Sequence, residues 1–211
     1  YEKATYYNTT DATYYDGVVG NWLFDDARKD GDTEILEVGT NYYVGLFHSR
    51  GREEYKTVDI RHILITPETG TKAQGDEGYE DEQTQLKAAA RTKAEEILAQ
   101  WKSGEATEDS FAQLALENSA DGSKYDGGLY TRVTKGWAVE EFNDWCFDAS
   151  RKDGDTGIVD TTYGSHVMYF VGYDLPAWAA SVTSDLQEKA ASEWSTALSE
   201  NADVQQSDFG M

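Results

Sequence analysis

WCFDASRKDGDTGIVDTTYGSHVMYF, residues 145–170, is the stretch of sequence that decides how this chain folds. A helix over about 138–150 is expected to end within it, and the run at 152–155 predicts a tight turn. Two strands, over about 157–162 and 165–172, are expected after the turn. This part of the chain is therefore predicted to form a helix, a turn and two strands in that order.

The same pattern occurs a second time, 123 residues earlier in the chain. Residues 22–47 read WLFDDARKDGDTEILEVGTNYYVGLF, and twelve of the 26 aligned positions are identical. An internal repeat of this kind indicates two copies of one scaffold, so we expect a helix over about 18–29 and strands over about 34–38 and 42–48. Tyr43 stands where the second copy has His166, so only the second copy carries a side chain there that titrates near neutral pH.

Length and composition limit the class of protein. The 211 residues are 39% hydrophobic, which allows one large or two small folded domains. With 18 basic against 40 acidic residues the net charge is −22, which argues against nucleic acid or an anionic membrane as the partner. No apolar run is long enough to span a membrane, and the lone Cys146 excludes an internal disulfide. The chain begins at Tyr1 rather than at methionine, as expected of a mature or trimmed form.

The sequence between and after the two copies predicts two further strands and three further helices. Residues 58–66 (VDIRHILIT) alternate, with His62 on the same face as Ile60 and with Ile63 on the other. Residues 68–82 are expected to be an acidic loop. A long helix over about 83–102, a helix capped by Thr107, a short strand at 129–133 and a tail helix over about 176–200 complete the expected elements. This order favours an α+β fold, a small sheet covered by helices.

Histidine is the side chain best suited to chemistry near neutral pH, and the chain has three. His62 and His166 both lie within expected strands next to apolar residues, so each is either a hydrogen-bonded core residue or part of a site. His48 ends a strand and is expected at the surface.

The segments around these two histidines form an ordered series of motifs. The series runs from RHILI (61–65) through FAQLA (111–115), NSAD (118–121) and GGL (127–129) to YGSH (163–166). It resembles the parvulin family of peptidyl-prolyl cis-trans isomerases over about residues 57–173. The resemblance implies a four-stranded antiparallel sheet surrounded by helices and an activity on X–Pro bonds, without a metal or a cofactor.

The resemblance also implies roles for individual residues. Its catalytic group is His62, Asp121 and His166, with Thr161 hydrogen-bonded to the histidine pair. Its substrate-binding group is Leu129, Trp137, Ala138, Phe142 and Tyr163, of which Phe142 forms the aromatic wall of the proline pocket. The sequence departs from the family at Ala138, where a methionine is usual, and at Tyr130, where the family has glycine.

Elementary chemistry agrees with such a site. Rotation about an X–Pro bond breaks no covalent bond, so it requires no activated nucleophile. An apolar pocket that holds the proline ring, with polar groups that stabilise a twisted amide, is sufficient. The same groove in a non-catalytic protein would be a chaperone-type binding site for extended polypeptide, and this alternative stays open.

Three rival sites are weaker. His62, His166 and Asp121 form a two-histidine, one-carboxylate set, but no two of them have the short spacing of a metal-binding pair. Cys146 lies among apolar helix residues, and its counterpart in the first copy is Leu23, which favours core packing. The two Asp-Gly-Asp turns lack the further oxygens of a calcium loop.

Three parts are expected along the chain. Residues 1–53 are the rear half of a degenerate parvulin-like unit, 54–174 are a parvulin-like domain, and 175–211 hold a helix that packs on the first unit. Parvulin units with flanking helices resemble extracytoplasmic foldases and surface-anchored chaperones of bacteria. The resemblance implies proline-containing, unfolded or extended polypeptides as partners and a location outside the cytoplasm. It leaves the oligomeric state open.

Overall fold

A computed structural model describes residues 17–49 and 51–201. The chain divides into two compact units between Arg52 and Glu53. We call the part before this point the small unit and the part after it the large unit.

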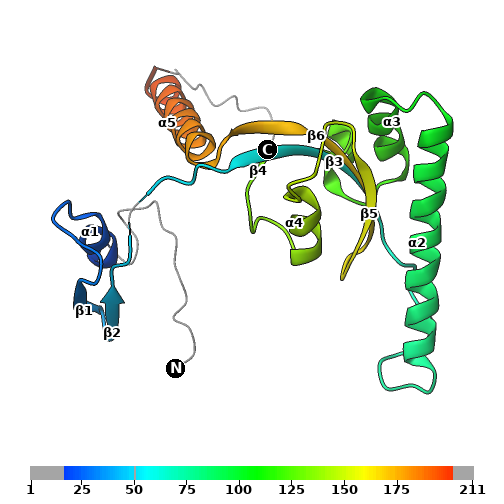
Figure 1. Ribbon diagram of the computed structural model, residues 1–211, viewed down its shortest axis with the longest axis horizontal. Coiled ribbons are helices and arrows are strands. Elements are labelled where there is room, and N and C mark those ends of the chain that lie inside the picture. Colours follow the sequence, from blue (N-terminus) through cyan, green and yellow to red (C-terminus); the bar gives the residue numbers. More distant parts are fainter. Residues whose placement is uncertain (1–16, 50, 202–211) are drawn as a thin grey trace, which may run out of the picture. The chain divides into compact units, whose positions relative to one another are not determined.

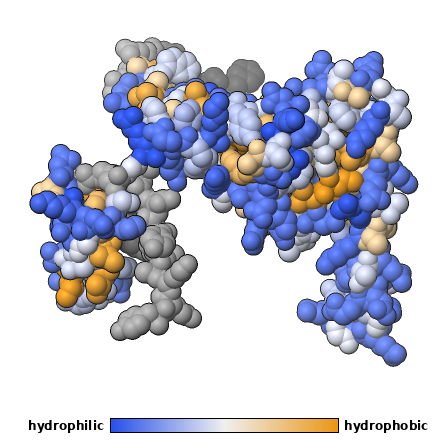
Figure 2. Space-filling model, in the orientation of Figure 1, coloured by the Kyte–Doolittle hydropathy of each residue, from blue (hydrophilic) through white to orange (hydrophobic). Residues whose placement is uncertain are grey.

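The small unit consists of one helix and one hairpin. Helix α1 (Val18–Phe24) is followed by strands β1 (Thr33–Val38) and β2 (Asn41–Leu46), which pair antiparallel. Trp22, Leu36 and Phe47 form its core. Ile35 and Val44 pair on the opposite face of the hairpin and are 66% and 80% exposed. Figure 2 accordingly shows apolar surface gathered on this hairpin.

The large unit contains a four-stranded sheet in which every neighbouring pair is antiparallel. Its order is β4 (Leu129–Val133), β3 (Lys56–Ile65), β6 (Gly164–Pro176) and β5 (Thr156–Thr161). The helices are α2 (Tyr79–Ser103), α3 (Glu108–Asn118), α4 (Glu140–Cys146) and α5 (Ala177–Asn201), with a short 3₁₀ turn, η1 (Gly122–Asp126). The expected α+β fold is confirmed.

Helices cover both faces of this sheet, and the alternation along β3 separates two cores. Ile63 points to a cluster with Ile97 and Phe111 from α2 and α3. Ile60 points to the other face, where Phe142 and Cys146 of α4 pack. In Figure 1, α2 and α4 lie on opposite sides of β5. The face under α4 is the one that carries His62.

The long helix starts earlier than the sequence suggested. Residues 68–82 were expected to be a loop, yet α2 begins at Tyr79. Acidic residues Glu80, Asp81 and Glu82 occupy the first turn, where the helix dipole favours negative charge. The carboxylate of Glu82 accepts hydrogen bonds from Thr71 and Lys72, which ties the preceding loop to this turn. The cap of α3 is as expected, since Thr107 and Ser110 form a capping box.

The two copies of the repeat make the same local interactions. The Nε of Arg28 donates to the carbonyl of Trp22, and that of Arg151 to the carbonyl of Trp145, at 3.1 Å in both copies. Each guanidinium also lies over the ring of its tryptophan, at 4.4 and 4.0 Å from the centroid. The identical residues are therefore the ones that fasten the turn to the helix before it.

Two expected helices end several residues early. Helices were expected over about 18–29 and 138–150, but α1 ends at Phe24 and α4 at Cys146. The cause is an aspartate shortly after each helix. Asp25 accepts a hydrogen bond from the N–H of Ala27 and Asp148 one from the N–H of Ser150, so the backbone turns there.

The terminal helix is attached to the start of the large unit. The N–H of Ala177 donates to the carbonyl of Tyr55, and Ala177 and Ala180 are buried. Further along α5, Leu186 and Trp194 are 62% and 69% exposed. Within the residues described, no helix is long and apolar enough to cross a membrane.

Candidate active site

The two histidines singled out by the sequence meet on the α4 face of the sheet. In the β3–β6 register, His62 pairs with Met168 and His166 with Leu64, which makes the histidines diagonal neighbours on one face. They border a hollow of about 470 Å³. Its lining consists of His62, Asp121, Tyr130, Trp137, Ala138, Val139, Phe142, Tyr163 and His166.

The histidine rings are buried and hydrogen-bonded to each other. The Nδ1 atoms of His62 and His166 are 3.0 Å apart, and the rings are nearly parallel, at 15°. The Nε2 of His166 lies 2.9 Å from the hydroxyl oxygen of Thr161. The Nε2 of His62 lies 3.2 Å from Oδ1 of Asp121, but the approach is too oblique for a hydrogen bond. That nitrogen has no hydrogen-bond partner among the described residues.

The charge of Asp121 selects one direction for the protons along this chain of groups. A carboxylate repels a lone pair and attracts an N–H, so it favours the tautomer of His62 that carries its proton on Nε2. The Nδ1 of His62 is then an acceptor, and the Nδ1 of His166 donates to it. The Nε2 of His166 in turn accepts from the hydroxyl of Thr161.

Asp121 is held ionised by several donors that meet on one oxygen. Burial raises the pKa of Asp121, but donors and charge outweigh burial and hold it at about 2. The donors are the N–H and hydroxyl of Ser123, and the hydroxyl of Tyr130 at 3.0 Å; at acidic pH, the charge of protonated His62 also lowers the pKa of Asp121. The carboxylate is therefore charged throughout the range in which proteins function.

Both histidines are neutral at physiological pH. Burial lowers the pKa of His62 and outweighs the opposing effect of Asp121. Burial and the neighbouring His62 lower the pKa of His166 to about 4. A neutral pair with fixed tautomers presents one N–H donor, on Nε2 of His62, at the Asp121 end.

Aromatic rings form the wall of the hollow. Phe142 is buried and meets both histidine rings edge-on, at 5.5 Å from His62 and 5.3 Å from His166. Trp137 is half exposed and lies against Tyr130, with ring centroids 4.7 Å apart. These rings suit an apolar ring such as that of proline.

Two glycines allow the backbone to come this close. Gly128 has a positive φ of 75°, and a Cβ there would collide with the carbonyl oxygen of His62. The carbonyl of Gly128 accepts a hydrogen bond from the N–H of His62, 2.9 Å long. Gly164, with φ 143°, similarly leaves no room for a Cβ beside Ile65.

The structure brings together eight of the nine residues expected at the site. Seven of them line the hollow directly and Thr161 reaches it through His166. Leu129 is the exception: it pairs with Arg61 and does not line the hollow. Adjacent strand residues point to opposite faces, and here Tyr130 faces the histidines instead. Tyr130 and Ser123 were not expected at the site. For Tyr130, the tyrosine in place of the family's glycine could have indicated its role.

The structure also places two other reactive side chains, Cys146 and His48. Cys146 is fully buried in the core under α4, and burial raises its pKa to about 12, so its thiol stays protonated. His48 is exposed at the surface, as expected, and lies 3.3 Å from Asp30.

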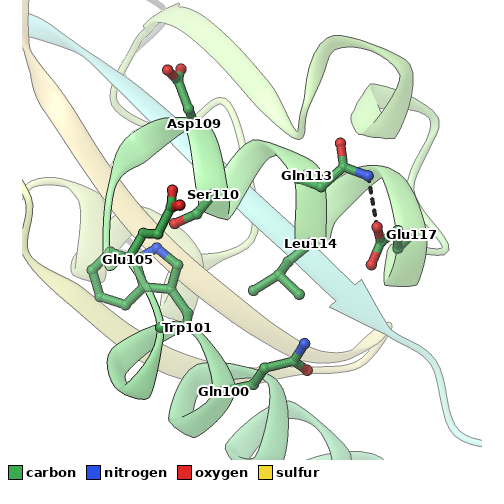
Figure 3. A pocket seen from close by; sticks show the side chains of 9 residues that line it. Gln100, Trp101, Glu105, Asp109, Ser110, Gln113, Leu114 and Glu117 are labelled. Atoms are coloured by element: carbon green, nitrogen blue, oxygen red, sulfur yellow. Dashed lines mark hydrogen bonds between the residues drawn. The ribbon is translucent and has the colours of Figure 1, made fainter.

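A second hollow of similar size lies between α2 and α3. Figure 3 shows Glu105 beside the ring of Trp101, Leu114 below α3, and the amide of Gln113 turned toward Glu117, to which it donates a hydrogen bond. It contains no histidine or other side chain that titrates near neutral pH. The chemistry is therefore concentrated at the histidine pair.

Comparison with known proteins agrees with this geometry. Residues 45–171, more than half of the chain, match the family model described as a PPIC-type PPIase domain. The chain belongs to the PPIC-type PPIase family. The matched region includes every residue of the histidine site, from His62 to His166.

Individual relatives of this PPIC-type PPIase chain include foldases. Foldase protein PrsA 1 of Listeria innocua is 29% identical over 142 residues, which cover 65% of this chain and 39% of that protein. PrsA 1 of Listeria monocytogenes is 28% identical over the same shares. The chain thus spans about two fifths of the length of these relatives.

Two solved structures were also found to be similar. PrsA from Bacillus subtilis matches with a TM-score of 0.46 and 22% identity, over 73% of this chain and 53% of that one. The PPIase domain of TBPAR42 matches with a TM-score of 0.40 and 26% identity, over 54% and 98%.

Proposed function

We propose that this chain is a peptidyl-prolyl cis-trans isomerase that acts on X–Pro bonds of extended or unfolded polypeptides. One observation carries the proposal: a hollow walled by Phe142 and Trp137 ends at a buried pair of neutral, hydrogen-bonded histidines. Membership of the PPIC-type PPIase family supports it.

The reaction requires only a modest reduction of its free-energy barrier. Rotation about the X–Pro bond has a barrier of about 18–20 kcal/mol, and no covalent bond is broken. A thousandfold acceleration requires about 4 kcal/mol of additional binding to the twisted amide. Groups that hold the proline ring and a fixed polar environment beside the amide are enough, without a metal or a cofactor.

The residues of the hollow fit these tasks. The proline ring packs against Phe142 and Trp137, which fixes one side of the bond. The Nε2–H of His62 is buried beside Oδ1 of Asp121, so the histidine pair and this carboxylate form a polar floor under the twisting amide. Asp121 keeps that proton on Nε2, and Thr161 orients His166 behind it. The mechanism is non-covalent, since the thiol of Cys146 is buried and protonated.

A protease-coupled assay on Xaa-Pro tetrapeptides tests this proposal. The rate should exceed the spontaneous one, and His62→Ala and Phe142→Ala should each lower kcat/KM by at least about tenfold. His48→Ala, which removes the exposed histidine, should leave kcat/KM unchanged. A wild-type rate equal to the spontaneous rate would reject an isomerase.

The second candidate function is a non-catalytic chaperone that uses the same groove. Tyr130 and Ala138 favour it, because both change the shape of the pocket relative to the family pattern. A chaperone would suppress aggregation of an unfolded client that contains no proline, and His62→Ala would suppress it equally well. An isomerase without holding activity would fail this assay and pass the tetrapeptide assay.

We also propose that the small unit, within residues 1–53, is the rear half of a degenerate parvulin-like copy. The equal hydrogen bonds of Arg28 and Arg151 support this, and Tyr43 in place of His166 supports a structural or substrate-holding role. Residues 175–211 would cover it, since α2 covers the equivalent face of β5 and β6 in the large unit.

The resemblance to bacterial foldases further supports a place outside the cytoplasm, with exported proteins as clients. Relatives named as foldases favour assisted folding as the role of the whole protein.

A further inference from the structure

We propose that Tyr130 is a positioning residue of this site, which holds the Asp121 carboxylate against His62 and supports Trp137 at the mouth of the hollow. The inference rests on the proposed isomerase function for its kinetic consequences. Its structural part can be tested whether or not the chain is active.

The contacts of Tyr130 reach both halves of the site. Its hydroxyl donates to Oδ1 of Asp121 at 3.0 Å, the same oxygen that lies 3.2 Å from Nε2 of His62. Its ring lies 5.4 Å from the ring of His62 and 4.7 Å from that of Trp137. Tyr130 therefore links the carboxylate, the histidine and the tryptophan.

The position of Tyr130 in the fold makes these contacts rigid. It lies in β4 and pairs with Ile60 of β3, two residues from His62. Gly128, two residues before Tyr130, accepts a hydrogen bond from the N–H of His62 through its carbonyl. A long side chain anchored at both its backbone and its hydroxyl loses little further freedom when substrate binds.

Three elements besides β4 present groups to Asp121. His62 faces it from β3, His166 from β6, and Ser123 of η1 donates its N–H and hydroxyl. From β4, the hydroxyl of Tyr130 is the donor. Removal of its hydroxyl therefore weakens the stabilisation of the carboxylate without adding a charge.

The expected consequences follow from this geometry. In Tyr130→Phe, the pKa of Asp121 should rise by about one unit, because a charged acceptor loses one hydrogen bond. The pKa of His62 should fall further, since a carboxylate that is no longer held against the ring attracts the imidazolium less strongly. kcat/KM at neutral pH should fall about tenfold through loss of alignment. In Tyr130→Leu, KM should also rise, because Trp137 then loses the ring that supports it.

NMR titration of the full chain tests the proposal. The carboxyl carbon of Asp121 and the ring nitrogens of His62 and His166 are followed from neutral to acidic pH in wild type and Tyr130→Phe. Tyr125→Phe is the matched control, since this tyrosine of η1 is 77% exposed and is not among the donors to the carboxylate. Ser123→Ala, which removes another donor to the same oxygen, should shift Asp121 in the same direction.

An upward shift of the Asp121 pKa and a downward shift of the His62 pKa in Tyr130→Phe, both absent from Tyr125→Phe, support the positioning role. Unchanged titrations in a folded Tyr130→Phe would overturn it. If the wild type has no isomerase activity but the titrations shift, the proposed function fails and the positioning role stands. If Tyr130→Phe does not fold, the Tyr130 hydroxyl is titrated in wild type and in Asp121→Asn instead: its raised pKa should fall when the carboxylate is lost, and an unchanged pKa would overturn the role.

Discussion

His166 shows how one buried residue changes the chemistry of a repeated scaffold. Its equivalent in the small unit is Tyr43, and the backbone around the two positions pairs in the same way, β1 with β2 and β5 with β6. In the large unit the imidazole is nine-tenths or more buried and bonded to a second imidazole. A neutral donor–acceptor pair of this kind keeps its orientation only while both imidazole rings stay neutral.

This burial makes stability depend on pH. The pKa of His166 is about 4 in the folded chain against 6.5 in the unfolded one, so the unfolded state binds more protons below about pH 6.5. The free energy of unfolding should therefore fall as pH drops from about 6.5 to 4, by on the order of 3 kcal/mol. His62 acts in the same direction. Asp121, with its depressed pKa, contributes a loss only at lower pH, between about 3.8 and 2.

Urea unfolding at a series of pH values measures this dependence. The variant His166→Gln cannot bind the proton, so its stability should vary less between pH 6.5 and 4 than that of the wild type. An equal slope in the two proteins would show that His166 is not the group responsible.

At the scale of elements, the turn after α4 determines where Phe142 lies. Arg151 follows the helix, donates back to the carbonyl of Trp145 and lies over its ring, so the turn and the helix form one rigid piece. Asp148 and Asp155 lie 3.9 Å from its guanidinium on either side. The same residues recur around Arg28 in the small unit, where no histidine site exists among the described residues. This set of contacts is therefore structural.

Replacement of this arginine should destabilise the large unit. Arg151→Lys keeps the charge but loses the Nε–H and the flat surface on Trp145, and we expect a loss of about 1–2 kcal/mol in the free energy of unfolding. Lys152→Ala, at the exposed neighbour, should change it by less than about 0.5 kcal/mol. Denaturant unfolding of both variants measures the difference. Equal effects would mean that the turn does not depend on the guanidinium.

At the scale of the whole molecule, two apolar surfaces are exposed. One is the outer face of the small-unit hairpin, where Ile35 and Val44 are exposed, and the other is the stripe on α5 that includes Leu186 and Trp194. In the large unit the equivalents of Ile35 and Val44 are Ile158 and Val167, which pack with Ile97 of α2. A 25-residue amphipathic helix therefore covers this type of face, and α5 has the same length.

Limited proteolysis tests the proposal that α5 covers the small unit. If it does, residues 1–50 and 176–200 should resist digestion together, because a covered face protects both segments. Leu186→Asp should make both segments sensitive, whereas Asp185→Asn, the exposed neighbour, should not. Rapid trimming of both ends of the wild type to a stable core of about 57–173 would reject the proposal.

Much of the fold was predictable because it depends on local patterns. Alternation at 58–66 indicated β3 and its two faces, helical spacing indicated α2, and the repeat indicated the turn and the hairpin. The ends of α1 and α4 were wrong because a single aspartate side chain, not the hydrophobic pattern, stops each helix. The start of α2 was wrong because acidic residues, which suggested a loop, are favourable in a first helical turn.

The sequence by itself determined the α+β fold, the family and seven of the residues that line the hollow, because motif order and periodicity are properties of the chain. Only the tertiary structure decided that His62 and His166, 104 residues apart, share a hydrogen bond, that both are neutral, and that Asp121 is charged. Burial and strand register produce those states. The structure also replaced Leu129 with Tyr130, because the pleat of β4 turns that side chain toward the histidines.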